Sequence, residues 1–414
     1  MSRELQRTEW AEREVEEFVS LPLVAEFVFR SPQTDDAGRQ REVADLLVMH
    51  GDGGILISQK CQEDSSSRNS DKTVSWARKK AKEAVSQLRG ALRTAVGKKV
   101  WCDHPRRGRV DFPQGLPKIN HGIVLVEVFQ PVGLEGEASD LPLDFQSTPI
   151  SYLSVNDFLN LAIELRTTPE LLEYLSARSS LPPSDLRTIG DEKSLFEFYL
   201  LNGGSFSGCE SRAHAHKIAS SQQQQLQELR ESKAQANRYS SLLEHVADQL
   251  ATRNPHYAEG LAPAQVAKFD TPSGRTKYLE MQSMLTHLRL AERAELGWAF
   301  LGVIERLRPE AEGFTYMAAH LDSRPQDIFV FASGKELARG VMLKRMETLM
   351  RGAMAFYSKR RCLAIIDRDG LGYEVGLGLM ESSATAEEQA IGRHLFGNLR
   401  MMDKRLTLSS SEAQ

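Results

Sequence analysis

The segment EVADLLVMHGDGGILISQK, which begins at Glu42, constrains the fold more than any other part of this chain of 414 residues. It contains two apolar runs of strand length separated by GDGG. Glycine and aspartate tolerate the positive φ angles that a tight turn requires. The pattern therefore predicts a β-hairpin, and it is the strongest hairpin signal in the chain.

Charged and polar side chains lie at defined positions of this predicted hairpin. Asp45 stands at the beginning of the first strand, and Lys60 ends the second. Because side chains alternate along a strand, Ser58 and Lys60 share one face, and Gln59 takes the opposite face with Ile57. The turn folds Lys60 back toward Asp45.

The residues around the hairpin predict an α/β domain over residues 1–145. A Glu-rich helix over residues 2–20 precedes AEFVFRSP, a short strand, and QTDDAGRQ, a loop by its turn composition. After the hairpin, VSWARKKAKEAVSQLRGALRTAV has the spacing of a helix with one apolar face. KVWCDH and HGIVLVEVFQP predict strands, and the second is apolar enough to be covered on both faces.

The rest of the chain predicts a helical connector over residues 146–215 and a C-terminal helical and α/β domain over residues 216–414. In the connector, Thr168 is a plausible N-cap and Pro169 the first residue of the helix TPELLEYLSAR. A Gln-rich helix opens the C-terminal domain. It is followed by the helices GWAFLGVIERL and ELARGVMLKRMETLMRGAMAFY, the strands FTYMAAHL and DIFVFAS, and a hairpin that turns at DRDG.

Charge is distributed unevenly along the chain. The formal net charge is −4, but the stretch from Lys72 to Arg109 is strongly basic and holds only two acidic residues, Glu83 and Asp103. Lysine and arginine supply the salt-dependent part of nucleic-acid affinity. This basic stretch predicts contacts with phosphate groups, and the candidates are Arg78, Lys79, Lys82 and Arg89.

Other features restrict the class of protein. The four cysteines are scattered without a C-x-x-C pair, so neither a zinc knuckle nor a disulfide framework is predicted. The charged N-terminus lacks the apolar core of a secretory signal, and no apolar run reaches the length of a membrane span. The expected location is the cytoplasm, with no membrane contact.

The hairpin resembles the PD-(D/E)xK nuclease superfamily, closest to its nuclease-related (NERD-like) and Mrr-like branches. These families have an acid, a hairpin and then an acid-x-Lys motif, followed by a helix in which a Gln before a Leu closes over the site. SWARKKAKEAVSQLRGALR is similar to that helix, and Gln87 matches its glutamine. The resemblance implies a restriction-endonuclease-like mixed sheet flanked by helices.

Carried over to this sequence, the resemblance implies that Asp45 is a metal ligand, Lys60 the motif lysine, and Gln87 a supporting polar group. Position 58 departs from the pattern, because Ser58 is a weak neutral ligand where the family has a carboxylate. Other residues are candidates to compensate for it. These are Gln59, if a bulge shifts the register, Glu42, Glu16 or Glu17 on the first helix, and Glu63 and Asp64 beyond the strand.

The leading hypothesis is a nuclease that hydrolyses the phosphodiester bonds of DNA with Mg²⁺ or Mn²⁺, and that acts in bacterial defence against foreign DNA. The alternative is an inactive nuclease-fold protein that binds nucleic acid or a partner protein. A third hypothesis makes residues 216–414 a sensor or oligomerisation module, in which the Gln-rich helix forms a coiled-coil-like contact. A homo-oligomer or a partner protein of a defence system is therefore also considered.

Overall fold

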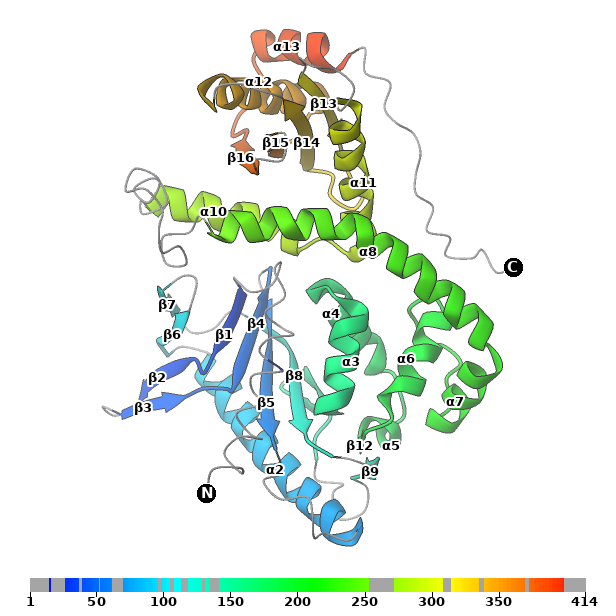
Figure 1. Ribbon diagram of the computed structural model, residues 1–414. Coiled ribbons are helices and arrows are strands. Elements are labelled where there is room, and N and C mark those ends of the chain that lie inside the picture. Colours follow the sequence, from blue (N-terminus) through cyan, green and yellow to red (C-terminus); the bar gives the residue numbers. More distant parts are fainter. Residues whose placement is uncertain are drawn as a thin grey trace. The chain divides into compact units, whose positions relative to one another are not determined.

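The computed structural model describes residues 15, 27–36, 39–51, 53–61, 70–95, 98–104, 108–112, 118–128, 131–134, 141–252, 272–307, 314–334, 339–368 and 372–397. The chain divides into two compact units, Met1–Glu231 and Ser232–Gln414, which are described separately. The division falls within helix α8 (Gln223–Thr252) (Figure 1). The three domains predicted from the sequence stay a prediction.

A six-stranded mixed sheet forms the centre of the first unit (Figure 1). Counted across the sheet, the second strand is antiparallel to both the first and the third. The third, fourth and fifth strands run parallel, and the sixth is a short edge strand antiparallel to the fifth. In spatial order the strands are β1 (Val28–Arg30), β4 (Leu46–His50), β5 (Gly53–Lys60), β8 (Lys118–Val126), β11 (Thr148–Ser154) and β10 (Asp144–Phe145).

The predicted hairpin is confirmed as strands β4 and β5. The two strands pair from Leu46 opposite Ile57 to His50 opposite Gly53, and Gly51 in the turn has a positive φ of 56°. The pairing of β5 with β8 is irregular between Gly54 and Ile55. No bulge occurs at residues 58–60, so the shift of register considered for Gln59 is wrong and the predicted alternation holds.

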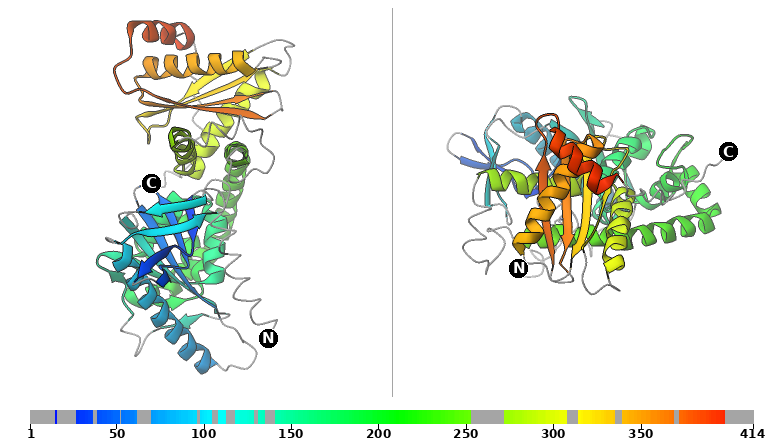
Figure 2. Two further views of the ribbon diagram at one scale, coloured as in Figure 1. Left: turned by 90° about the vertical axis from the view of Figure 1, so that its left-hand side faces the viewer. Right: turned by 90° about the horizontal axis from the view of Figure 1, so that it is seen from above.

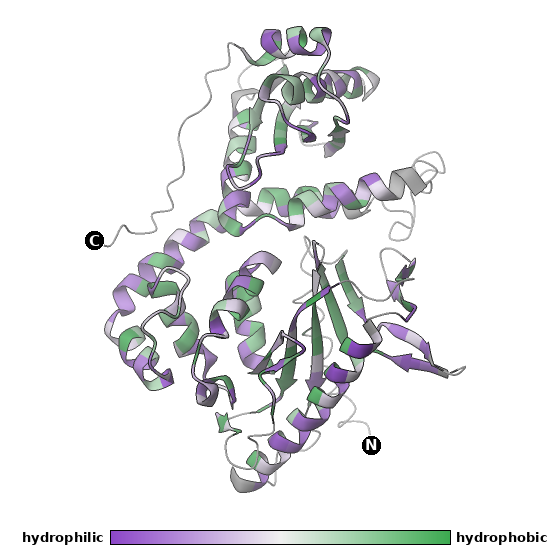
Figure 3. Cartoon of the chain, turned by 180° about the vertical axis from the view of Figure 1, so that it is seen from behind, coloured by the Kyte–Doolittle hydropathy of each residue, from purple (hydrophilic) through white to green (hydrophobic). Residues whose placement is uncertain are grey.

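Helices cover both faces of this sheet. Helix α2 (Ser70–Ala95) buries its apolar side, including Ala81 and Leu88, against one face, and its outer side is hydrophilic (Figure 3). Because α2 connects the parallel strands β5 and β8, it forms the crossover that such a pair requires. On the other face, α3 (Val155–Leu165) and α4 (Thr168–Arg178) pack against the alternate side chains. β8 is accordingly buried on both sides, as its apolar sequence predicts.

The first unit also contains a four-stranded sheet. Its strands, in spatial order, are β3 (Arg39–Glu42), β2 (Gln33–Asp36), β6 (Val100–His104) and β7 (Gly108–Phe112). The prediction of a loop for QTDDAGRQ is wrong, because this segment forms most of the β2–β3 hairpin. Turn-forming residues dominate its composition, but its ends extend into two paired strands, and β2 also pairs with a distant strand. Thr34 is buried and donates a hydrogen bond to the carbonyl of Lys99, and β2 pairs with β6.

The predicted helical connector is mainly helical. It contains α3, α4, α5 (Pro183–Leu186), α6 (Glu192–Leu201) and α7 (Arg212–Ser221). The assignment of Thr168 as an N-cap is wrong by one residue, because the hydroxyl of Thr167 accepts the hydrogen bond from the Glu170 amide. The connector also supplies β11 to the central sheet and β12 (Thr188–Ile189), which pairs with β9 (Val132–Gly133).

The second unit contains a four-stranded mixed sheet in the order β13 (Phe314–Ala319), β14 (Asp327–Gly334), β15 (Arg361–Asp367) and β16 (Tyr373–Leu379). Both predicted strands and the hairpin around DRDG are confirmed, with β15 antiparallel to β16. Helices α12 (Arg339–Tyr357) and α13 (Ala386–Phe396) cover one face (Figure 2). Helix α11 (Leu290–Leu307) covers the other, and α10 (Pro272–Thr286) precedes it.

The described structure confirms the α/β fold class: a mixed sheet flanked by helices, then a helical segment and a C-terminal α/β unit. None of the helices described is both long and apolar enough to span a membrane.

Candidate functional site

Two carboxylates mark the point where the chain leaves the small sheet and enters the central one. Glu42 ends β3 and Asp45 directly precedes β4. The junction is held by its backbone: the Ser31 amide donates to the Asp45 carbonyl at 2.9 Å, and the Val43 amide to the Pro32 carbonyl at 2.7 Å. Ser31 has a φ of 47°, a left-handed conformation that is uncommon for serine and that often accompanies functional sites.

Asp45 lies at the open end of the β4–β5 hairpin, as predicted. The register that pairs Leu46 with Ile57 brings Asp45 to Ser58 and Gln59. Its Oδ2 atom accepts a hydrogen bond from the backbone N–H of Gln59 at 2.5 Å. Because a charge-assisted hydrogen bond is stronger than a neutral one, this contact orients the carboxylate.

Ser58, Lys60 and Gln87 gather on the side of β5 that faces α2. Ser58 is 1% exposed and its hydroxyl donates to Gln87 Oε1 at 2.9 Å. Lys60 lies two residues further on the same face and is half-buried. A hydrogen bond from Lys80 lowers the pKa of Glu83, one turn before Gln87, and the charge of Lys60 contributes to the same shift. Lys60 therefore lies on the side of β5 that α2 covers, and its role as the motif lysine stays a prediction.

Two hollows lie on either side of the carboxylates, and Glu42 and Asp45 line both of them. The first extends toward α2, where Arg41 and Gln87 contribute to its wall. The second extends toward β1 and β5 and is lined by Arg30, Ser31, Glu42, Asp45, Leu46 and Gln59. The structure thus brings Asp45 together with Glu42, a predicted ligand, and with Gln59.

The donor set fits a hard divalent cation. Mg²⁺ prefers oxygen ligands and is commonly held by one or two carboxylates together with waters and substrate phosphates. Gln59 also lines the second hollow; its side chain is 7% exposed, and its Oε1 atom has no hydrogen-bond partner among the described residues. In the described part of the chain, no three His, Cys, Asp or Glu side chains group closely enough to hold a metal ion.

The other predicted acids cannot be compared with this geometry. Glu16, Glu17, Glu63 and Asp64 lie outside the described residues, and Val15 is the one described residue of the predicted first helix.

The predicted nucleic-acid contacts fall into two groups on α2. Lys79 and Lys82 are exposed, whereas Arg78 and Arg89 are half-buried. The Arg89 guanidinium lies over the Phe145 ring at 5.8 Å, and that of Arg93 lies over the same ring at 5.7 Å. Lys79 and Lys82 are consequently the cations of the predicted set that α2 presents to solvent.

Sequence reasoning missed the arginines of the two hollows. Arg30 and Arg41 are exposed and line the second and the first hollow, respectively. Each stands next to a predicted strand or a candidate acid in the sequence, which is a weak signal. Arg30 comes near the carboxylates because β1 pairs with β4, whereas Arg41 lies in β3 and directly precedes Glu42 in the sequence.

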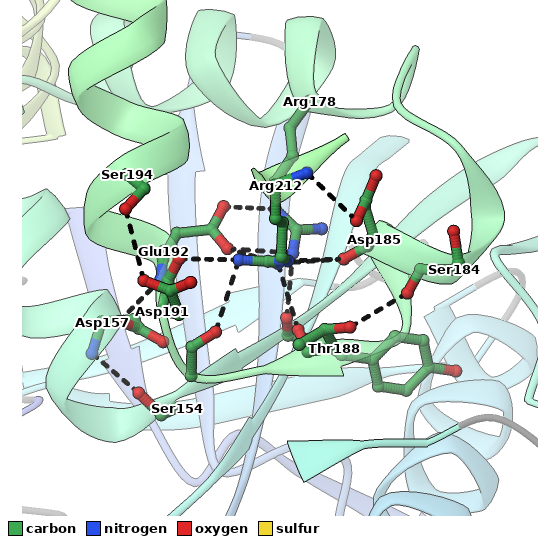
Figure 4. A network of polar contacts seen from close by, with 12 residues as sticks. Ser154, Asp157, Arg178, Ser184, Asp185, Thr188, Asp191, Glu192, Ser194 and Arg212 are labelled. Carbon is green, nitrogen blue, oxygen red and sulfur yellow. Dashed lines mark hydrogen bonds and ion pairs between the residues drawn. The ribbon is translucent and has the colours of Figure 1, made fainter. Parts of the chain in front are cut away.

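Sequence reasoning also missed a buried ionic network on the other face of the central sheet (Figure 4). Glu192 accepts hydrogen bonds from Arg178 at 2.5 Å and from Arg212 at 3.0 Å. Burial would raise the pKa of Glu192, but the two arginines outweigh it and lower the pKa to about 2. Arg178 also donates to the Tyr152 carbonyl of β11, so the network ties the helices to the sheet.

The first unit is therefore an α/β structure in which Glu42 and Asp45 line the same two hollows at the open end of a hairpin, whose second strand is covered by a basic helix. Comparisons with known protein families, with curated protein sequences and with solved structures give no match to this chain.

Proposed function

We propose that the protein is a metal-dependent nuclease that hydrolyses phosphodiester bonds of DNA, of the PD-(D/E)xK type that its hairpin resembles. The observation that carries the proposal is the hydrogen bond between Asp45 and the backbone of the Ser58–Lys60 segment. This contact supports the arrangement of an acid, Asp45, beside a strand that ends in the motif lysine, Lys60. Glu42 provides a second carboxylate, and it lines the same hollows as Asp45.

The proposed roles follow from the chemistry of each side chain. Asp45 and Glu42 would hold Mg²⁺ or Mn²⁺, which supplies Lewis-acid stabilisation and a more acidic water when bound. Lys60 offsets the negative charge that develops on the phosphate, with Gln87 as a supporting group. Lys79 and Lys82 bind the phosphate backbone of DNA. A cytoplasmic role in defence against foreign DNA, alone or with a partner protein, is part of this proposal.

Cleavage assays test the proposal directly. Supercoiled plasmid and single-stranded DNA are incubated with the protein and Mg²⁺ or Mn²⁺, and Asp45→Asn and Lys60→Ala are each expected to lower the rate by about 100-fold or more. Asp144→Asn, at an exposed position of β10, is the control and should cleave normally. Intact DNA with both metals would contradict the proposal.

A second candidate function is binding of DNA or a partner protein without cleavage. One observation favours it: the Ser58 hydroxyl donates its proton to Gln87, so position 58 supplies no anionic oxygen. Under this alternative, the parent protein and Asp45→Asn bind DNA equally in a fluorescence anisotropy assay, and neither cleaves it.

A further inference from the structure

Strand β16 lies at one edge of the sheet in the second unit, and among the described strands only β15 pairs with it. It has seven residues, pairs with β15 in an unbroken register, and contains neither lysine nor proline. Its single charged residue, Glu374, is buried and lies 3.7 Å from a guanidinium nitrogen of Arg368. Edge strands are commonly protected by a lysine, a proline, a bulge or a short length. β16 has none of these protections.

Hydrogen bonds at the two ends of β16 show which residues direct their backbone groups outward. The backbone N–H of Met380 donates to the Arg360 carbonyl, so residue 380 faces β15. The direction alternates along a strand, and the even-numbered residues of β16 therefore face β15 while the odd-numbered ones face away. Tyr373 agrees with this alternation, because its backbone N–H donates to Oε1 of Gln249 on α8 at 3.2 Å. Three further residues of β16 direct their backbone groups away from the sheet: Val375, Leu377 and Leu379.

The side chains of these three residues form an apolar row on the face of the sheet opposite α12. A Cβ atom on Gly376 would lie 2.7 Å from Cε of Met346, so the even-numbered positions face α12. Side chains alternate along a strand, which places Val375, Leu377 and Leu379 on the other face. Leu379 is 45% exposed, and the other two are half-buried. A strand that paired with β16 would cover this row and the outward backbone groups together.

The order of residues along β16 favours a second copy of this chain as the partner. In an antiparallel pair with a twofold axis at Leu377, Leu377 lies opposite its own copy and Val375 lies opposite Leu379 of the other copy. All of these residues direct their backbone groups outward, so each pair can exchange two backbone hydrogen bonds. This register leaves out Tyr373, whose N–H is already engaged, and sets no two charges opposite each other. The edge is thus complementary to itself, as a twofold interface requires.

We propose that two copies of the chain associate through β16, antiparallel and centred on Leu377, so that the four-stranded sheets of the two second units join into one continuous sheet. The contact is made by the edge of this sheet and not by the Gln-rich helix α8, for which a coiled-coil-like contact is predicted from the sequence. The inference concerns the second unit alone, so it holds or fails independently of nuclease activity.

Sedimentation equilibrium of the full-length chain tests the proposal, and the parent protein should have twice the mass of one chain. Leu379→Lys places a charge opposite Val375 of the other copy and should weaken association about tenfold, because the twofold axis repeats the change at two pairs. The matched control is Val341→Lys in α12. Val341 is 44% exposed, close to the 45% of Leu379, and the control should associate as the parent does.

Disulfide formation tests the register. Opposed residues of a hydrogen-bonded antiparallel pair have Cα atoms about 5.5 Å apart, which suits a disulfide. Leu377→Cys should therefore form a covalent dimer when diamide oxidises the two thiols. Val375→Cys, which lies opposite Leu379 and not opposite its own copy, should form much less, and the parent protein shows the background from its four native cysteines. Denaturing gels without reductant measure the dimer.

Parent protein that stays monomeric would overturn the proposal, as would Leu379→Lys that folds by circular dichroism and associates like the parent. Equal weakening by Val341→Lys would show that the charge acts without a contact at β16. Loss of association in Ala318→Lys, with Leu379→Lys unaffected, would place the contact at β13, the other edge of the sheet. If Leu379→Lys does not fold, Leu377→Cys decides, and dimer no greater than the parent background counts against β16.

Discussion

The Glu192 carboxylate lies fully inside the first unit, where Tyr174, Arg178 and Arg212 all donate hydrogen bonds to it. Burial of an ion pair costs desolvation energy, so the pair adds little net stability. Removal of one partner is different, because it leaves the remaining charges buried and uncompensated. The network therefore matters more for holding α4, α6 and α7 in one arrangement than for overall stability.

Glu192→Gln is expected to destabilise the protein by about 3–5 kcal/mol, since two buried guanidinium groups lose their counter-charge. Urea denaturation followed by circular dichroism measures the change. Glu173→Gln, at an exposed position of the same region on α4, is the control and should change stability by less than about 1 kcal/mol.

The pH dependence of the free energy of unfolding, compared between the parent protein and Glu192→Gln, provides a second test of the network. The pKa of Glu192 in the folded protein, about 2, lies below its ordinary value of 4.5. Its contribution to stability is therefore present above pH 4.5 and is lost as the pH falls toward 2. Glu192→Gln should lose less stability than the parent over this range, and parallel curves would contradict the assignment.

At the scale of elements, glycines control how closely α12 and α13 approach in the second unit. A Cβ atom on Gly392 would lie 2.6 Å from the carbonyl oxygen of Gly352 and 2.9 Å from Cβ of Phe356. Both are closer than van der Waals contact allows. The pair of helices can cover the sheet, with Phe396 buried beneath them, because position 392 lacks a side chain.

Gly392→Ala should therefore lower the free energy of unfolding by about 1–3 kcal/mol, because the two helices must move apart. Gly302→Ala in α11 is a matched control, since a Cβ atom there meets no heavy atom within 4 Å. Alanine is the better helix former, so this control should stabilise the unit by about 0.5–1 kcal/mol. Thermal denaturation distinguishes the two, and equal effects would contradict the proposed close contact.

At the scale of the whole molecule, the net charge does not favour binding to DNA, whereas the distribution of lysine and arginine along the chain does. The chain is weakly acidic overall, with a net charge of −4, yet α2 presents exposed lysines near the candidate site. Each contact between a cation and a DNA phosphate releases counterions, so the number of contacts can be measured from the salt dependence of binding. Net charge alone does not identify such contacts. DNA affinity should accordingly depend on a few cations of α2.

Lys79→Ala and Lys82→Ala should each reduce the slope of log affinity against log salt concentration by about 0.9, which is the release expected for one phosphate contact. Fluorescence anisotropy with duplex DNA at several salt concentrations measures this slope. The control is Lys193→Ala on α6, whose side chain is 75% exposed and lies beside Glu197. A slope that changes as much in the control as in the α2 variants would contradict a specific phosphate contact.

The local pattern of the sequence was enough to predict several parts of this molecule. The β4–β5 hairpin, the opposite faces of Ser58 and Gln59, the apolar side of α2 and the double coverage of β8 all follow from periodicity within a short segment. Such features are local because the alternation of a strand and the turn of a helix repeat every few residues.

Tertiary structure decided the features that join distant segments. It paired the QTDDAGRQ segment with β6, placed Glu42 and Asp45 in shared hollows, and buried Gln59 Oε1 with no hydrogen-bond partner among the described residues. It also buried Glu192 between arginines 14 and 20 residues away in the sequence. Burial and charge compensation depend on contacts between strands and helices that are remote along the chain, and no short-range pattern records them.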